Sequence, residues 1–187
     1  MISSQSSPLH VFVVVTGLPG VGKSTLARAL ASNVGLVILE LDRMEAPLFK
    51  QGIEGDAIGW SAYEALTALA EDNLALGHGV VLDSVGWTRK LRTSWAALAE
   101  ANGAVFRPVE VICSDLSLHR LRVETRNRTT RSGWANPEWN TVEASRSLYE
   151  AWDQPRLLLD SVHPFEELVA EAVNYVRKSV IGDMAQL

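Results

Sequence analysis

The sequence predicts an α/β fold in which helices cover both faces of a parallel sheet. Short apolar runs alternate with helical patterns along the whole chain. The first run leads directly into a glycine-rich loop and then a helical pattern. With 187 residues, 47% hydrophobic and 21% charged, the composition is that of an ordinary globular domain. We therefore expect a single three-layer domain over residues 1–187, with flexible tails at 1–8 and 181–187.

The strands are expected where β-branched and other apolar residues run together between turn signals. In chain order these runs are VFVVVT, VILEL, VVLD, VFRPVEVI and LLLD, at residues 11–16, 37–41, 80–83, 105–112 and 157–160. Between them, apolar residues recur three and four positions apart, which is the pattern of an amphipathic helix. This spacing predicts helices at about 23–33, 60–76, 88–102, 116–127, 137–152 and 164–180.

Two segments interrupt the alternation of strands and helices. The segment RMEAPLFKQGIEGDAIG, residues 43–59, contains three glycines and little periodicity, so we expect a loop there. The segment RNRTTRSGWANP, residues 126–137, is basic and rich in turn residues. Because ligands bind beyond the carboxyl ends of parallel strands, both segments are positioned to cover a site. We interpret the first segment as a loop on the side of the site where a second substrate, the acceptor, binds. We interpret the second segment as part of an Arg-rich lid at about 120–137.

The loop GLPGVGKST fits the pattern G-x-x-x-x-G-K-[ST], which cradles phosphate oxygens with successive backbone N–H groups. In this interpretation Lys23 reaches the β- and γ-phosphates, and the Ser24 hydroxyl binds Mg²⁺. A simple glycine turn is the alternative, but the order strand, loop, helix favours a phosphate site. The nucleotide-binding residues expected from the motif are Gly17, Leu18, Pro19, Gly20, Val21, Gly22, Lys23, Ser24 and Thr25.

Two aspartates follow predicted strands at the same edge of the sheet as the loop. Asp42 either orients an attacking hydroxyl and accepts its proton, or caps the next turn. Asp83 ends the apolar run GVVLD, which is the pattern of an aspartate that holds Mg²⁺ directly or through water. A turn aspartate is the alternative for Asp83.

The segment HRLRVETRNRTTR contains five arginines. Arg122 and Arg126 are four residues apart, so on a helix they share one face and direct two guanidinium groups at one target. Phosphate oxygens match such groups, and an arginine near the γ-phosphate stabilises charge in the transition state. The alternative is a solvated helix in which Glu124 pairs with a neighbouring arginine.

Several further residues are candidates for contacts with an acceptor. Arg43 follows Asp42, and Arg92 lies on the helix after Asp83; for each arginine a solvated surface position is the alternative. Trp60 and Trp87 are near the expected acceptor side and can stack on a ring, whereas core packing is the usual role of tryptophan.

These motifs together resemble the small P-loop kinases of the polynucleotide kinase, zeta toxin and chloramphenicol phosphotransferase group. The resemblance rests on GLPGVGKSTLARALA, ELDR, GVVLDSVGWTRKLR, LHRLRVETRNR and LLLDSVHPFEELVAEAV, and it covers nearly the whole chain, from residue 10 to about 180. It implies a P-loop NTPase fold with strand order 2-3-1-4-5, ATP and Mg²⁺ as cofactors, and γ-phosphate transfer to a hydroxyl.

By position, the resemblance makes Asp42 the general base and Asp83 the aspartate that ends the third strand. It makes Arg92 the acceptor-side arginine, and Arg122 and Arg126 the lid arginines. Adenine is expected near the lid helix and the SVHPFEE turn.

One position departs from the family pattern. Polynucleotide kinases of this group carry an arginine three residues after the base aspartate, where it holds the acceptor's phosphate, but this chain has Glu45. With a net charge of -5, this residue favours an uncharged or cationic small acceptor over a nucleic-acid end.

We therefore expect an ATP-dependent kinase acting on a hydroxyl of an antibiotic, nucleoside or sugar-like molecule, and antibiotic resistance is one role of such an enzyme. A polynucleotide 5′-hydroxyl kinase and a nucleotide-dependent regulatory ATPase are the alternatives. The single Cys113 cannot form an internal disulfide, and no apolar stretch approaches about 20 residues. We expect no signal peptide, because the first residues have neither a basic region nor a long apolar core. A cytoplasmic monomer or homodimer without membrane contact is expected.

Overall fold

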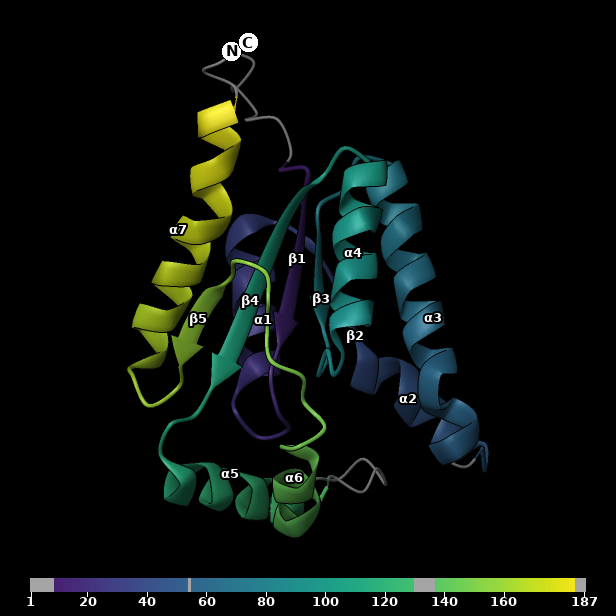
Figure 1. Ribbon diagram of the computed structural model, residues 1–187, viewed down its shortest axis with the longest axis vertical. Coiled ribbons are helices and arrows are strands. Elements are labelled where there is room, and N and C mark those ends of the chain that lie inside the picture. The colour runs from purple at the N-terminus through teal and green to yellow at the C-terminus, as the bar shows by residue number, and fades with distance from the viewer. Residues whose placement is uncertain (1–8, 54, 130–136, 184–187) are drawn as a thin grey trace.

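The computed structural model describes residues 9–53, 55–129 and 137–183 (Figure 1). One sheet of five parallel strands lies at its centre, and its order β2-β3-β1-β4-β5 confirms the expected topology. The strands are β1 Val11–Thr16, β2 Val37–Glu40, β3 Val80–Asp83, β4 Val105–Ile112 and β5 Leu157–Asp160. Four of them have the bounds expected from the sequence, and β2 ends one residue earlier.

Helices cover both faces of the sheet. They are α1 Lys23–Val34, α2 Leu41–Lys50, α3 Gly55–Ala75, α4 Arg89–Ala101, α5 Leu116–Thr129, α6 Trp139–Ser145 and α7 Phe165–Asp183. Helices α1 and α7 pack on one face, and α2, α3 and α4 lie on the other. Helices α5 and α6 lie across the carboxyl ends of the central strands (Figure 1). The fold is therefore a three-layer sandwich in which a pair of helices covers the carboxyl ends of the central strands.

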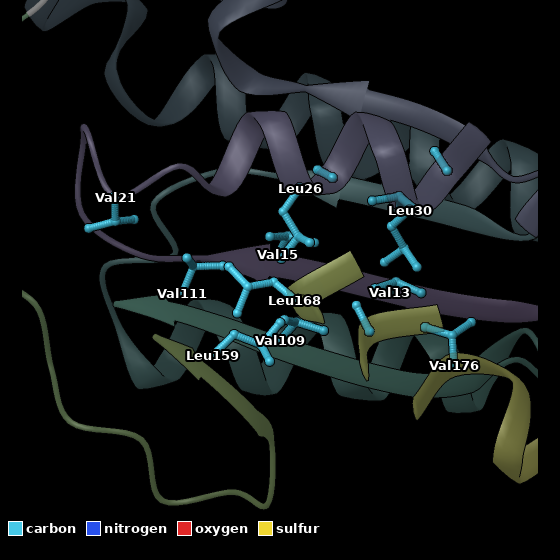
Figure 2. Close-up of a cluster of buried hydrophobic side chains, with 14 of the residues drawn as sticks. Val13, Val15, Val21, Leu26, Leu30, Val109, Val111, Leu159, Leu168 and Val176 are labelled. Carbon is cyan, nitrogen blue, oxygen red and sulfur yellow. The ribbon is translucent and has the colours of Figure 1, made fainter. Parts of the chain in front are cut away.

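Alternation along β1 divides the core into two clusters. Val13 and Val15 point toward α1 and α7, in the cluster that Figure 2 shows. Phe12 and Val14 point to the opposite face, where Trp95 of α4 is fully buried. Because both faces of β1 are covered, all six of its residues are buried. This rigid central strand supports the loop that follows it.

The parallel register brings the polar ends of three strands together. Asp83 pairs with Val15 on one side and with Glu40 on the other. The loop after β1 and the helix after β2 therefore begin beside Asp83, at the carboxyl edge of the sheet.

The expected loop at 43–59 is largely helical, so that prediction was wrong. Helix α2 covers Leu41–Lys50 although it contains Pro47, which lacks an N–H for the helical ladder. Leu41, Met44 and Leu48 pack into the core beside α3, and this burial stabilises the helix. Helix α3 then begins at Gly55, and non-helical dihedral angles at Gly59 mark a kink.

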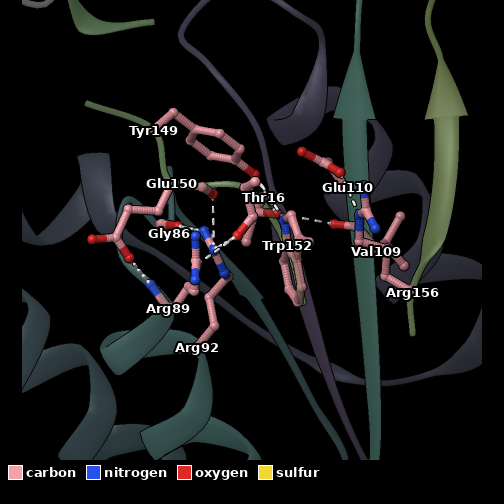
Figure 3. A network of polar contacts seen from close by, with 11 residues as sticks. Thr16, Gly86, Arg89, Arg92, Val109, Glu110, Tyr149, Glu150, Trp152 and Arg156 are labelled. Atoms are coloured by element: carbon pink, nitrogen blue, oxygen red, sulfur yellow. Dashed lines mark hydrogen bonds and ion pairs between the residues drawn. The ribbon is translucent and has the colours of Figure 1, made fainter. Parts of the chain in front are cut away.

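The helix expected at 137–152 is also shorter than predicted. Helix α6 ends at Ser145, and an irregular segment, residues 146–156, runs back to β5. Arg92 of α4 holds this segment, since its guanidinium donates to the carbonyls of Glu150 and Ala151 at 2.8 and 3.0 Å (Figure 3). It also donates to Gly86 O at 2.7 Å and lies 4.5 Å from the centre of the Trp152 ring. Carbonyls engaged in this way are not part of a helical ladder.

A second chain of contacts ties the same segment to the sheet (Figure 3). The Trp152 Nε1–H donates to the Tyr149 hydroxyl at 3.0 Å. That hydroxyl lies 3.3 Å from Thr16 Oγ1, which in turn donates to Val109 O. The segment is thereby fixed against β1 and β4, close to the start of the glycine-rich loop.

The remaining sequence expectations concern the ends of the chain and the lid. Helix α7 continues through Asp183, so residues 181–183 belong to a helix and not to a tail. Residues 1–8, 130–136 and 184–187 lie outside the described residues, as does the part of the expected lid after Thr129. Among the helices that the structure describes, none has the length and apolarity needed to cross a bilayer.

We expect Arg92→Ala to lower the free energy of unfolding by roughly 2–4 kcal/mol, because three carbonyls lose a charged donor. Arg92→Lys keeps the charge but not the planar fork, so it should recover less than half of the loss. Urea denaturation of the three proteins measures the effect. An alanine variant as stable as the wild type would show that this segment does not depend on Arg92.

Candidate active site

The glycine-rich loop follows a path that only glycine permits at two positions. Gly17 has φ +140°, and a Cβ there would lie 2.2 Å from Val111 O of β4. Gly20 has φ +87°, and a Cβ there would lie 2.4 Å from Val123 Cγ2 of α5. Substitution at either position would push the loop away from its supports. The loop is therefore held tightly between β4 and α5.

His119 of α5 forms a further support for this loop. The ring is 1% exposed, and its Nε2 lies 2.8 Å from the carbonyl oxygen of Pro19. Since a carbonyl only accepts, Nε2 carries the proton in this contact. Burial lowers the pKa of His119, and the ring rests edge-on against Trp139 of α6 with centroids 5.2 Å apart. His119 thus links the loop to the α5 and α6 pair.

Lys23 is the first residue of α1, directly after the loop. Its side chain is 6% exposed. The first N–H groups of a helix have no acceptor within that helix, so the start of α1 directs free donors and a partial positive charge outward. Together with the Lys23 ammonium, this end of the helix is suited to bind phosphate.

A cavity of about 490 Å³ opens over the loop and the start of α1. Lys23, Arg122 and Arg126 supply positive charge, and Phe165 and Leu168 of α7 supply apolar surface. Its other lining residues are Gly20, Val21, Gly22, Ser24, Thr25, Leu26, Arg28, Asp42, Val111, Ser161 and His163. We call this the donor cavity.

A second cavity of about 190 Å³ lies next to it. Glu45 of α2, Tyr63 of α3 and Trp87 line it, and Trp87 lies in the connection between β3 and α4. Its other lining residues are Pro19, Lys23, Leu41, Asp42, Val85, Arg126 and Pro137. We call this the acceptor cavity.

Three residues line both cavities: Lys23, Asp42 and Arg126. Asp42 lies in the first turn of α2 and Arg126 on α5, and Arg126 Nη2 is 3.2 Å from Asp42 Oδ2. Both side chains are nearly half exposed, so this ion pair contributes little to stability. The ion pair lies where the two cavities meet, and this position matters more than its contribution to stability.

Arg122 has a different environment. Its guanidinium donates to Ser161 Oγ at 2.7 Å and to Ser161 O at 2.9 Å. These contacts fix Arg122 at the wall of the donor cavity. Arg122 and Arg126 both line this cavity, as expected for two arginines on one helix face.

Asp83 lies beneath the loop with little solvent contact. Its side chain is 4% exposed, and Oδ1 has no hydrogen-bond partner within the described residues. Burial raises the pKa of Asp83, whereas Lys23 and a hydrogen bond with Ser24 lower it. A buried carboxylate oxygen without a partner, next to a serine hydroxyl, is a donor set that suits Mg²⁺. The residues expected to hold the metal therefore fit it.

Glu45 has an unusual environment in the acceptor cavity. Burial, and to a lesser extent the nearby Asp42 carboxylate, raise the pKa of Glu45 to about 7, while Lys23 opposes the rise. Within the described part of the chain, the carboxyl group of Glu45 makes no hydrogen bond or ion pair. The acceptor cavity therefore holds a carboxyl group that keeps its proton to a higher pH than an exposed glutamate does.

The other sequence candidates are distributed differently. Arg43 is exposed, and Trp60 is 54% exposed with its ring 5.4 Å from that of Tyr63. Trp87 lines the acceptor cavity, whereas Arg92 lines neither cavity because its guanidinium is buried against residues 150–152. Gly17 and Leu18, at the start of the loop, line a smaller hollow beside β4 and not the donor cavity.

Sequence reasoning missed three residues of this site. Tyr63 occupies an apolar position of α3, His119 shows no ligand spacing, and Ser161 was considered only as part of the SVHPFEE turn, without a role of its own. His119 and Ser161 act through partners distant in sequence, and Tyr63 lines a cavity formed by residues distant in sequence, so no local pattern marks any of them.

We expect Glu45→Gln to raise thermal stability at about pH 8 and to have little effect at about pH 5. The folded state holds the Glu45 proton more tightly than the unfolded chain, so the wild type loses stability as pH rises from about 4.5 toward and beyond 7. Allowing for solvent screening, the gain at high pH is about 1 kcal/mol, or about 2–4 °C.

Calorimetric melting curves of both proteins across this pH range measure the difference. Glu64→Gln, at an exposed position on α3, is the matched control and should show no such trend. A constant difference between Glu45→Gln and wild type at all pH values would contradict the raised pKa.

Solved structures with the same architecture were identified by comparison. A gluconokinase from Sinorhizobium meliloti 1021 superimposes with a TM-score of 0.67 at 20% identity, covering 97% of this chain and 99% of that one. The APS kinase CysC of Mycobacterium tuberculosis, in complex with AMPPNP and APS, has a TM-score of 0.68 at 20% identity, covering 92% and 99%. Kti12 of Chaetomium thermophilum, in complex with ADP-AlF3, has a TM-score of 0.68 at 19% identity, covering 88% and 98%.

These similarities confirm the fold of the small P-loop kinases that the sequence predicted. A family match adds sequence evidence, since the family AAA_33, described as an AAA domain, matches residues 12–153. That range includes the glycine-rich loop, both aspartates and helices α1 to α6. The chain therefore belongs to the AAA_33 family, with the fold of a small P-loop kinase.

Proposed function

We propose that the protein is an ATP-dependent phosphotransferase that moves the γ-phosphate of ATP to a hydroxyl group of a small molecule. The observation that carries this proposal is the junction of the two cavities at Lys23, Asp42 and Arg126. A phosphoryl group at this junction would have a donor on one side and an acceptor on the other. Kinases among the structurally similar proteins support the same reaction class.

The donor cavity suits ATP in size and charge. Its volume of about 490 Å³ is within the usual range for small-molecule sites. The loop N–H groups and Lys23 would bind the phosphates, and Arg122 would add charge from a position fixed by Ser161. The apolar surface of Phe165 and Leu168 would contact adenine, near the SVHPFEE turn. The structures of APS kinase in complex with AMPPNP and of Kti12 in complex with ADP-AlF3 support this assignment.

Ser24 and Asp83 would hold Mg²⁺ beside the phosphates. The buried oxygen of Asp83 without a partner is the observation that supports the ion. When bound, Mg²⁺ supplies positive charge that offsets the charge on the phosphate oxygens.

Asp42 is the proposed general base. It lines both cavities, so its carboxylate can meet an acceptor hydroxyl next to the γ-phosphate. The acceptor oxygen bonds to the γ-phosphorus while the bond from that phosphorus to the bridging oxygen breaks. The hydroxyl proton passes to Asp42, and ADP leaves. Arg126, which is paired with Asp42 in the free protein, would neutralise charge on the transferring group.

The acceptor cavity favours a small molecule over a nucleic-acid end. Its volume of about 190 Å³ admits a small ring or one part of a larger acceptor. Glu45 is located there, and a carboxylate repels the phosphates of an oligonucleotide.

Consumption of ATP by the purified protein with Mg²⁺, measured on a panel of hydroxyl compounds, tests the proposal. The panel contains nucleosides, sugars, aminoglycosides, other antibiotics and a 5′-hydroxyl oligonucleotide, and mass spectrometry identifies each product. One added phosphate on a small molecule is the expected result. Phosphate only on the oligonucleotide would favour the end kinase, and hydrolysis without any modified acceptor would favour a regulatory ATPase.

We expect Lys23→Ala to abolish measurable transfer and to weaken ATP binding, because the buried ammonium serves both. Asp42→Asn should keep ATP affinity within about twofold and reduce kcat by about 10²–10⁴-fold, the usual range for loss of a general base. Calorimetric titration with a non-hydrolysable ATP analogue and steady-state kinetics separate the two effects. Normal turnover by Asp42→Asn would remove Asp42 from the base role.

Arg126→Ala is expected to reduce kcat by about 10²-fold or more, with a smaller effect on ATP affinity, because its charge matters most in the transition state. Arg120→Ala is the matched control, since Arg120 is exposed on the same helix and pairs with Glu124. Steady-state kinetics with both variants make the comparison. Equal losses in both variants would indicate a general effect on α5 instead of a role at the phosphate.

A further inference from the structure

The acceptor cavity carries charges that divide into two groups. Its described lining has two cations, Lys23 and Arg126, and both also line the donor cavity. Asp42 lies at the same junction. Glu45 alone among these charged groups lines only the acceptor cavity. An acceptor that enters this cavity therefore meets an acidic side chain away from the reacting phosphate.

Glu45 is positioned to bind a group that the protein does not supply. It is half-buried on α2, and the charged or titratable groups that act on it or share its cavity are Asp42, Lys23, Tyr63 and Arg126. The described residues offer it no hydrogen bond or ion pair. A carboxylate removed from water in this way is costly unless a positive partner is provided.

Tyr63 gives a second, independent indication of a ligand. The side chain is 6% exposed, lines the same cavity, and its hydroxyl has no hydrogen-bond partner among the described residues. The Gly86 backbone is close enough to influence the pKa of Tyr63, although the two groups do not meet the geometry of a hydrogen bond. A buried hydroxyl without a partner is unfavourable, and a polar ligand would satisfy it.

Trp87 completes the surroundings of this carboxyl group. Its half-buried ring lines the cavity and is supported from behind by Tyr149, with ring centroids 6.5 Å apart. A carboxylate, a hydroxyl and an indole ring form the kind of pocket that binds an organic cation, through charge-assisted hydrogen bonds and contact with the aromatic face.

We propose that the acceptor is an amino alcohol or amino sugar whose ammonium group binds Glu45 while its hydroxyl faces Asp42. This inference rests on the proposed phosphotransferase function and specifies its substrate class. The Tyr63 hydroxyl would donate a hydrogen bond to a polar group of the same molecule, or accept one from it. Acceptors that carry a carboxylate or phosphate would meet Glu45 with like charge and are disfavoured.

Matched pairs of free and N-acetylated amines test this specificity. We would use glucosamine with N-acetylglucosamine, and kanamycin with kanamycin acetylated on its amino groups. Calorimetric titration is carried out with the protein saturated by a non-hydrolysable ATP analogue, so that binding is measured without chemistry. The free amine should bind at least about tenfold more tightly than its neutral partner in one or both pairs.

Variants separate the Glu45 contact from general charge effects. Glu45→Gln should reduce the preference for the free amine to within about twofold. Glu64→Gln removes the same charge from an exposed position of α3 outside the cavity, and it should keep the preference. Equal or tighter binding of the acetylated partners, retention of the preference in Glu45→Gln, or no binding of any amine while the ATP analogue binds would overturn the proposal.

Transfer assays on the same compounds distinguish this inference from the proposed function. Phosphorylation of neutral acceptors, in preference to amines, would leave the kinase function intact and overturn the amine specificity. Amine binding that depends on Glu45 but leads to no phosphorylation would support the amine site and count against the kinase function.

Discussion

The close packing of the glycine-rich loop between β4 and α5 is the constraint on which the rest of the site depends. A side chain at Gly17 would collide with Val111 of β4, and one at Gly20 would collide with Val123 of α5. His119, also on α5, bonds to the Pro19 carbonyl of the loop. The loop, helix α5 and the carboxyl edge of the sheet thus form one unit. The position of α5 sets where its arginines lie, so the phosphate loop and its charged surroundings are fixed together.

Charge is distributed across this unit in a way that separates two tasks. The donor cavity collects Lys23, Arg122 and Arg126, which suit a polyphosphate, and the acceptor cavity adds Glu45. Asp42 lies between them, paired with Arg126. Similar phosphate machinery occurs throughout folds of this kind, whereas acceptor chemistry depends on local residues such as Glu45. The donor cavity therefore indicates the type of reaction, and the acceptor cavity indicates the type of acceptor.

Much of the fold and part of the site were predictable from sequence, for identifiable physical reasons. Apolar runs marked all five strands, and the strict glycine-rich motif marked the loop after the first one. Because the strands are parallel, Asp42 and Asp83 necessarily lie at the edge of the sheet that holds this loop. Helix α2 was missed because the segment 43–59 contains three glycines and little periodicity, although core contacts maintain the helix. Arg92 was expected at the acceptor, but its partners are carbonyls 58 and 59 residues away, which no local pattern reveals. Tyr63 was missed for a similar reason, because its apolar position in α3 gives no sign of the cavity it lines.

The most direct test of the central claim is a crystal structure of the protein with Mg²⁺ and a non-hydrolysable ATP analogue. The account predicts that the terminal phosphate lies at the junction of the two cavities, in contact with Lys23 and facing Asp42, with the nucleoside toward Phe165. A terminal phosphate directed away from Asp42 and the acceptor cavity would contradict it.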